Sequence, residues 1–362
     1  MENASSAPRP APIREDVAQV HAIRALAMIG IFLHHLFNGI PSLGASPLGA
    51  PLAPTFQAMA LGVVVFNIMA GFVLARQHFG PAHKALEPYP KFMGRRLARL
   101  YPLYGLCLLV FLPANLLVFG LDASGLFQDF LLRIFFLQSF SYQAIVSNTA
   151  AWWWLSLLVQ FSLLYPLVLT LFDRLGSARG FAVVAVGCWG LGLTLQTLAA
   201  AHPDSSWPHL AYMAGFNIPL RLPEFALGMW LAEAWLPGTG PIPLKRPYLL
   251  FCLGLSAVAL LPALSPAGLP LLPYRAFATI AVFMLLYLWP AMERLGHAKW
   301  ARWLSAASYG IYLTHQPILS YIGFWLPPMD PLARFGLMLV LGGAASVAVA
   351  HVLELVANKF TR

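Results

Sequence analysis

The sequence predicts an all-α integral membrane protein with about ten transmembrane helices, and three observations support that prediction. The chain of 362 residues is 59% hydrophobic and only 10% charged, with a mean hydropathy of +0.72. Soluble domains carry about 25% charged side chains, so a water-soluble globule is excluded. Ten apolar runs are long enough to cross a bilayer, and the basic residues between them alternate as the positive-inside rule requires.

The ten predicted spans are separated by short loops, with no inserted soluble domain. They lie at 20–40, 55–76, 99–120, 152–172, 180–200, 210–235, 248–265, 269–290, 303–325 and 335–357. A further apolar run at 130–140 is too short to cross and contains Arg133. It predicts a short re-entrant or interfacial segment between the third and fourth spans.

The basic residues predict that both termini are cytoplasmic. With the N-terminus inside, 17 of the 22 Lys and Arg residues fall in inside segments or at the span ends beside them, three in or near outer segments, and two (Arg24 and Arg221) within spans. Residues 1–19 then form a polar cytoplasmic tail, and residues 20–358 form a single transmembrane domain. The net charge of +9 is interpreted as topology, so we expect no nucleic-acid partner.

The first span carries Arg24 and His35 on one helical face. The two residues are eleven positions apart, and eleven rotations of about 100° bring a helical side chain back to within roughly 20° of its starting direction. Arg24 and His35 therefore point from the same face, about 16 Å apart along the helix axis. His34 points in a different direction. Charged groups inside spans are functional candidates. The alternative is equally open from this pair alone: Arg24 snorkels to the interface and His35 hydrogen-bonds between helices.

Three arginines enter the third span from the most basic inside loop. Arg95 and Arg96 lie four and three positions before Arg99, so the three side chains are predicted to form one cationic patch. Such a patch can bind phosphates through forked guanidinium contacts. The ordinary basic flank of a membrane span is an equally good interpretation.

Three later spans also contain ionisable groups. Arg221 and Glu224 are three positions apart and can neutralise one another as a buried ion pair. His315 lies in mid-span, where a packed, hydrogen-bonding histidine is more common than a catalyst. His351 and Glu354 form another local pair, which we interpret as structural.

Taken in order, these motifs resemble the acyltransferase 3 family of integral membrane acyltransferases over nearly the whole chain. The six matching segments are the R-x10-H pair of the first span, FNIMAGFVLA at 66–75, RRLARLYPLY at 95–104, WWLSLLVQFSLLYPL at 153–167, RLPEFALGM at 221–229 and SYGIYLTHQPIL at 308–319. Two positions depart from the family pattern. Leu158 stands where many members have Glu, and Ala70 stands where a small serine is frequent.

The resemblance implies transfer of an acyl group, usually acetyl, from cytoplasmic acetyl-CoA or another acyl-CoA to a hydroxyl group of a cell-envelope or exported carbohydrate or glycolipid. It implies a multi-pass protein of the bacterial inner membrane, in contact with membrane lipids and with polysaccharide-synthesis proteins as potential partners. No metal is expected. In the family the R-x10-H pair and the RxxR arginines form the functional core, which here falls on Arg24, His35, Arg96 and Arg99.

These expectations combine into one hypothesis. The phosphates of coenzyme A bind Arg96 and Arg99, beside Arg95, and Arg24 completes this cationic binding site. His35 acts as a general base on the acceptor hydroxyl or forms a transient acyl-histidine. The remaining candidates, for substrate contact or structural support, are Trp154, Arg221, Glu224, Tyr309, Tyr312 and His315.

Two other classes of protein fit the same residues. A polytopic transporter or flippase for an envelope glycolipid would use the buried charges to line a path. A catalytically inactive relative would organise a polysaccharide-synthesis complex, although the intact arginines and His35 argue against that role.

Overall fold

The computed structural model describes residues 17–79, 87–120, 123–147, 149–234 and 290–360, and within these ranges every regular element is a helix. In chain order the elements are α1 (Ala18–Asn38), α2 (Pro41–Gly44), α3 (Ala53–Ala58), α4 (Leu61–Phe79), α5 (Tyr89–Phe119), α6 (Ala123–Ile134), η1 (Gln138–Phe140), α7 (Tyr142–Ile145), η2 (Ala150–Trp152), α8 (Trp153–Leu175), α9 (Ser177–Ala201), α10 (Trp207–Ala214), α11 (Ile218–Ala234), α14 (Pro290–His297), α15 (Lys299–Trp325) and α16 (Pro331–Phe360). The predicted all-α class is therefore confirmed for the described part of the chain.

Six helical segments in the described ranges are long and apolar enough to cross a membrane. They contain α1, α3 with α4, α5, η2 with α8, α9 and α16, and they match the first five predicted spans and the last. Helix α15 has 27 residues and is long enough, but it falls outside this set because its sequence is more polar. The predicted spans at 248–265 and 269–290 lie outside the described residues, so the total of ten stays a prediction.

The predicted span at 210–235 is not one helix, because the chain breaks between α10 and α11. Pro219 has no N–H group to donate to the carbonyl of Gly215, the bond that a continuous helix would need. Arg221 instead donates from Nε to that carbonyl at 2.6 Å. Asn217 adds side-chain bonds to the carbonyls of Ser139 and Met213 at 2.8 and 2.9 Å. These bonds satisfy the polar groups that the break exposes.

The run at 130–140 forms the end of α6 and the short η1 helix between α5 and α8, consistent with a segment too short to cross. Arg133 is completely buried there. It pairs with Asp129 at 2.7 Å, bonds Ser147 Oγ at 3.0 Å, and lies over the Trp152 ring at 5.4 Å. Through these contacts Arg133 attaches the segment between α5 and α8 to the rest of the bundle.

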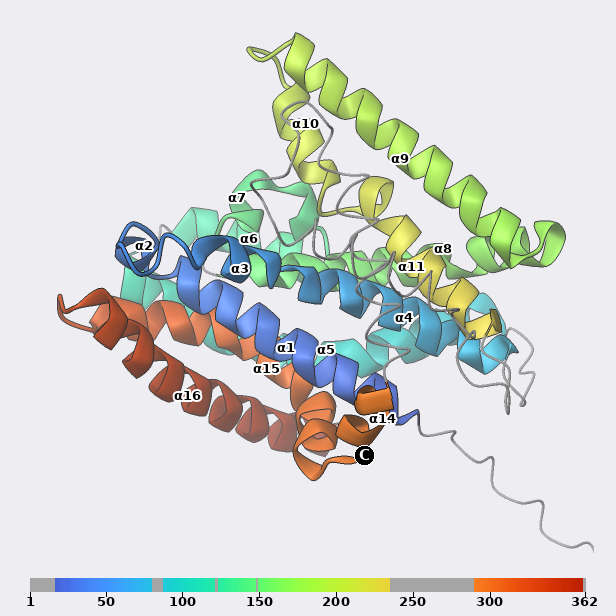
Figure 1. The fold of residues 1–362 in the computed structure, drawn as a ribbon. Helices are drawn as coiled ribbons and strands as arrows, with labels where there is room; N and C mark the ends of the chain where they lie inside the picture. Colours follow the sequence, from blue (N-terminus) through green and yellow to red (C-terminus); the bar gives the residue numbers. More distant parts are fainter. Residues whose placement is uncertain (1–16, 80–86, 121–122, 148, 235–289, 361–362) are drawn as a thin grey trace, which may run out of the picture.

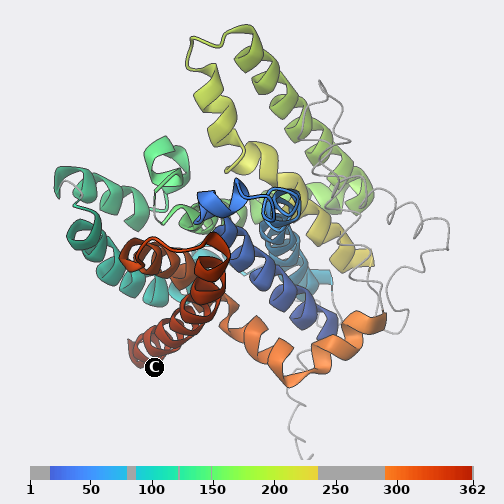
Figure 2. The same ribbon diagram turned by 60° about the vertical axis from the view of Figure 1, so that its left-hand side comes forward.

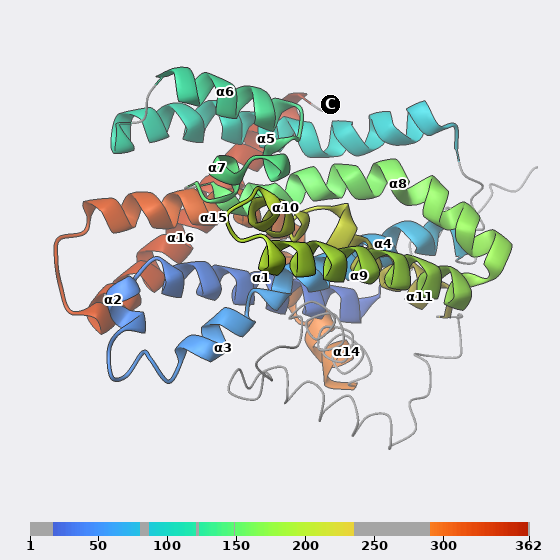
Figure 3. The same ribbon diagram turned by 90° about the horizontal axis from the view of Figure 1, so that it is seen from above.

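The long helices pack side by side around α1, α4 and α15 (Figure 1). Figure 3 shows α1, α5, α8 and α15 running in a similar direction, and Figure 2 shows α9 at the outside, next to α10 and α11. Helices α4 and α11 approach each other closely through their backbones. A Cβ atom added to Gly71 would overlap the carbonyl of Phe225, and one added to Gly228 would overlap that of Ile68. Glycine at both positions lets the two helices touch.

The first and last described helices bring their outer ends to the same end of the bundle (Figure 1). Arg24 near the start of α1 and Asn358 near the end of α16 line one cavity. The start of α1 and the end of α16 therefore lie on the same side of the bundle. Their location in the cytoplasm stays a prediction from the loop charges.

Candidate active site

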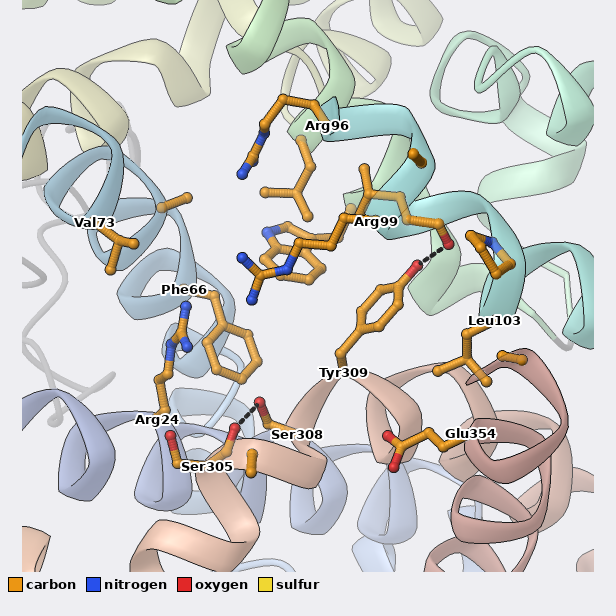
Figure 4. Close-up of a pocket in the computed structure, with 18 of the residues that line it drawn as sticks. Arg24, Phe66, Val73, Arg96, Arg99, Leu103, Ser305, Ser308, Tyr309 and Glu354 are labelled. Atoms are coloured by element: carbon orange, nitrogen blue, oxygen red, sulfur yellow. Dashed lines mark hydrogen bonds between the residues drawn. The ribbon is translucent and has the colours of Figure 1, made fainter. Parts of the chain in front are cut away.

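A cavity of about 580 Å³ opens among six helices at the end of the bundle where α1 begins and α16 ends. This volume lies within the range of roughly 300–1,000 Å³ that is usual for small-molecule sites. Figure 4 shows the labelled side chains around it. Its lining includes Arg24 from α1, Phe66 from α4, Arg96 and Arg99 from α5, Trp154 from α8, Tyr309 from α15 and Glu354 from α16.

Three guanidinium groups reach this cavity from two helices (Figure 4). Arg96 and Arg99 are one helical turn apart on α5, and Arg24 comes from α1. Arg96 donates from Nε to Ser162 Oγ at 3.2 Å. Arg24 and Arg99 form no hydrogen bond or ion pair with any described residue. Because cations that share a cavity repel one another, an anion is the ligand that this arrangement favours.

Arg95 does not belong to the cavity, which corrects the expected patch of three α5 arginines. Its side chain is 63% exposed and forms an ion pair with Glu87. Neighbouring residues on a helix point about 100° apart, so Arg95 turns toward Glu87 while Arg96 faces inward. Arg24 supplies the third cation instead.

Glu354 is the one carboxylate among the described residues that line the cavity. The sequence suggested a local pair with His351, but the described ion pairs do not include one between these two side chains. Glu354 occupies space that Gly310 of α15 leaves open, since a Cβ atom there would overlap Glu354 Oε1. On the same helix, Tyr309 donates its hydroxyl to the carbonyl of Leu100 at 2.9 Å. Glu354 is thus placed near the arginines without being paired to one of them.

A buried chain of hydrogen bonds connects the cavity wall to the Arg221–Glu224 pair. Trp154 donates from Nε1 to Asn67 Oδ1 at 2.7 Å, and Asn67 donates from Nδ2 to Glu224 Oε2 at 2.6 Å. Arg221 donates to Glu224 Oε1 at 2.9 Å. The predicted ion pair therefore forms. It does not line the cavity, and Asn67 and Trp154 link it to the cavity wall by hydrogen bonds.

The adjacent histidines of α1 have different surroundings. His34 bonds the carbonyl of Phe56 through Nδ1 at 3.0 Å, and its Nε2 accepts from Asn38 Nδ2 at 3.0 Å. His35 makes no hydrogen bond with any described residue. Its ring lies 5.1 Å from that of His315 on α15, measured between centroids. Arg24 and His35 both face the α15 side, in agreement with the helical-face argument.

His35 and His315 do not line the cavity and lie beyond an aromatic wall. Trp154 lines the cavity, and its ring centroid is 4.9 Å from that of Tyr312. Tyr312 is in turn 5.6 Å from His315, again between ring centroids. Trp154 and Tyr312 are only 8% and 1% exposed. The buried rings of Trp154 and Tyr312 therefore lie between the cavity and His315.

Two buried amide groups near the site were not singled out from the sequence. Asn67 is fully buried within the apolar segment 66–75, and its polarity there is the signal that could have identified it. Gln160 bonds Asn217 Oδ1 at 2.7 Å and Ser139 Oγ at 3.1 Å. This second network joins α8 to the break between α10 and α11, so it supports the fold around the site.

The described residues contain no group of three or more His, Cys, Asp or Glu side chains that could hold a metal ion. Comparison with curated proteins and with solved structures gives no significant match. The model of the acyltransferase 3 family, described as an acyltransferase domain, matches residues 17–353. That match covers nearly the whole chain, including the cavity-lining residues of α1, α4, α5, α8 and α15, and the protein belongs to the acyltransferase 3 family.

Proposed function

We propose that this membrane protein transfers an acyl group, acetyl in the first instance, from acyl-CoA in the cytoplasm to a hydroxyl group of a cell-envelope or exported carbohydrate. The observation that carries the proposal is a cavity with three arginines, two of them without a partner in the described chain, at the end of the bundle where α1 begins and α16 ends. The loop charges predict that this end faces the cytoplasm, which in a bacterium corresponds to the inner face of the inner membrane.

The donor's phosphates fit the arginine side of the cavity. Coenzyme A carries a pyrophosphate and a 3′-phosphate, and guanidinium groups bind phosphates through two parallel hydrogen bonds. Arg99 and Arg24 have free donors for such contacts, and Arg96 keeps donors beyond its bond to Ser162. The uncharged pantetheine arm and thioester would then extend along Trp154 toward His35.

His35 is our candidate for the chemical step. A neutral imidazole accepts the proton of the acceptor hydroxyl as the oxygen attacks the thioester carbonyl. The carbon–sulfur bond breaks, and the leaving thiolate takes the proton from His35 to become the free thiol. In the alternative route a nitrogen of His35 attacks the thioester carbonyl, the carbon–sulfur bond breaks, and the coenzyme A thiolate leaves. The acceptor oxygen then attacks the acyl-histidine, the carbon–nitrogen bond breaks, and the hydroxyl proton passes by way of His35 to the thiolate.

The acceptor would approach from the opposite end of α1. Asn38 and Gln57 are exposed there, and Gln57 donates to Asn38 Oδ1 at 2.7 Å, next to His34 and His35. Amide groups both donate and accept hydrogen bonds, as binding a polyhydroxylated sugar requires. Donor and acceptor would thus meet at His35 from opposite ends of the bundle.

The test is to reconstitute the purified protein in lipid and supply radiolabelled acetyl-CoA with candidate envelope glycans. Free thiol and labelled glycan should appear in equal amounts, and an equal quantity of H35A protein should produce neither. A transporter or flippase would move glycolipid without releasing thiol, and an inactive scaffold would do neither. Label that stays on the protein when the glycan is omitted would favour the acyl-histidine route.

A further inference from the structure

His315 is completely buried on α15, and its two ring nitrogens are in different situations. Nδ1 lies 2.8 Å from the carbonyl of Tyr312 and 3.1 Å from that of Ile311, so it carries the proton and donates it. Nε2 therefore presents a lone pair. That nitrogen is buried and has no hydrogen-bond partner in the described structure.

A buried acceptor without a donor loses its hydrogen bond to water and gains none in return, so such a group calls for an explanation. Three rings contact His315: those of Phe32, His35 and Tyr312. Phe32 has no polar atom, and Tyr312 already donates its hydroxyl to the carbonyl of Ala151. His35 is the one of the three with an uncommitted N–H group.

The separation of the two imidazoles suits a direct bond. An N–H···N bond of about 2.9 Å, with roughly 1.1 Å from each nitrogen to its ring centre, spans about 5 Å between centroids. The observed centroid separation of His35 and His315 is 5.1 Å, with an angle of 55° between the ring planes. A rotation of the His35 ring about its soft terminal torsion is enough to form the bond without moving either helix.

We propose that His315 is a positioning residue that accepts a hydrogen bond from His35 and thereby selects the reactive tautomer of His35. With its proton held by His315 Nε2, His35 presents the lone pair of its other nitrogen to the acceptor hydroxyl. When that hydroxyl proton arrives, His35 becomes an imidazolium, and the bond to His315 stabilises its charge. The proton then leaves with the coenzyme A thiolate, and both histidines return to their starting state. This inference rests on the acyl transfer proposed above.

The experiment compares H315F, H315Q and wild-type protein, each reconstituted at equal folded amount. Phe keeps the ring but removes the acceptor, whereas Gln keeps a carbonyl oxygen that can replace Nε2. We expect H315F to lower kcat by about a hundredfold with little change in KM for acetyl-CoA. H315Q should recover a substantial part of kcat, and adding H315F to H35A should cause no further loss.

Two outcomes overturn different claims. If wild-type protein releases no thiol, the proposed acyl transfer is wrong, and the role of His315 is wrong with it. If wild-type protein is active but H315F and H315Q lose kcat equally, or if the loss adds to that of H35A, only the positioning role is wrong. If H315F does not fold, H315M takes its place as the variant without a hydrogen-bonding nitrogen or oxygen. If H315Q does not fold, H315N takes its place as the variant that keeps a carbonyl acceptor.

Discussion

His34 and His35 are neighbours in the chain, yet their ring nitrogens differ in their hydrogen bonds. Both nitrogens of His34 have hydrogen-bond partners, while His35 has none in the described chain. We expect H35A to reduce acyl transfer by about a hundredfold or more, since general base catalysis supplies about 10²–10⁴-fold. H34A should stay within a few fold of wild type. Thiol release measured at matched folded amounts tests both, and an equal loss would contradict the helical-face argument.

The arginines of α5 offer a matched comparison between cavity and surface. R96A and R99A should each weaken acyl-CoA binding by about ten- to a hundredfold, because a hydrogen bond to a charged group is worth about 1.5–3 kcal/mol. R95A should have little effect, since its exposed pair with Glu87 lies outside the cavity.

Arginine-to-lysine variants at positions 96 and 99 should rescue only partly, because a point charge does not reproduce the forked contact. The measurement is the dissociation constant for coenzyme A beside that for a pantetheine donor without the nucleotide. A loss of equal size for both ligands would show that the arginines do not bind phosphate.

At the scale of elements, the contact between α4 and α11 depends on two glycines. The overlaps at Gly71 and Gly228 involve the backbone of the opposite helix, which a side-chain rotation cannot relieve. We expect G228A to destabilise the protein by about 1–3 kcal/mol. G187A is the control, because a Cβ atom there meets nothing within 4 Å on α9. In detergent, the midpoint temperature of thermal unfolding should fall for G228A and stay at the wild-type value for G187A. An unchanged midpoint for G228A would show that α4 and α11 can move apart to accommodate the added methyl group.

The ion pair of α11 lies at that same contact. Removing Arg221 or Glu224 alone leaves a buried charge, at a cost of about 3 kcal/mol for a pair in which Arg221 keeps 22% of its side chain exposed. Each single variant should therefore lose folded protein, while the R221M/E224Q double variant should recover it. A neutral Gln at 224 can still accept from Asn67 and so keep Trp154 in place.

We expect that double variant to recover yield but not full acyl transfer, since Arg221 also holds the Gly215 carbonyl at the break before α11. Folded yield and thiol release are measured in one preparation. Full recovery of both would make the pair a purely structural element.

At the scale of the whole molecule, the cavity and the histidines lie at different depths. Arg24 and His35 are about 16 Å apart along α1. Donor and product should therefore appear on opposite sides of the membrane. In inverted vesicles, with the cytoplasmic face outward, external acetyl-CoA should label a glycan trapped inside. Right-side-out vesicles should not respond to external acetyl-CoA, and labelling in that orientation would contradict the predicted topology.

The sequence predicted the long helices well, because a lipid-facing surface must be apolar whatever the helix packs against. At 210–235 it did not predict the break between α10 and α11, because the residues around Asn217 and Pro219 are as apolar as their neighbours. The candidate site was predicted in part. Arg24, Arg96 and Arg99 meet in one cavity as the motifs suggested, but helical spacing could not separate Arg95 from Arg96, since both lie within one turn of Arg99.

Links between distant positions in the chain could not be predicted from periodicity. Trp154 bonds Asn67 across 87 positions, and Asn67 bonds Glu224 across 157. Such bonds depend on how helices cross, and a single sequence gives each helix's faces without giving its neighbours. The position of Glu354 beside the cavity could not be predicted for the same reason, because it depends on Gly310 of another helix.

The aromatic wall of Trp154 and Tyr312 also has an electrical consequence. A water-filled cavity carries little of the membrane potential, so most of the voltage falls across the dry layer of rings beyond it. Moving one elementary charge through that layer would cost or release about 2.3 kcal/mol per 100 mV. In the proposed reaction the phosphates stay with the arginines, and only an uncharged thioester crosses the rings. Acylation of an external acceptor would then draw no current, and its rate would not depend on whether the membrane is energised.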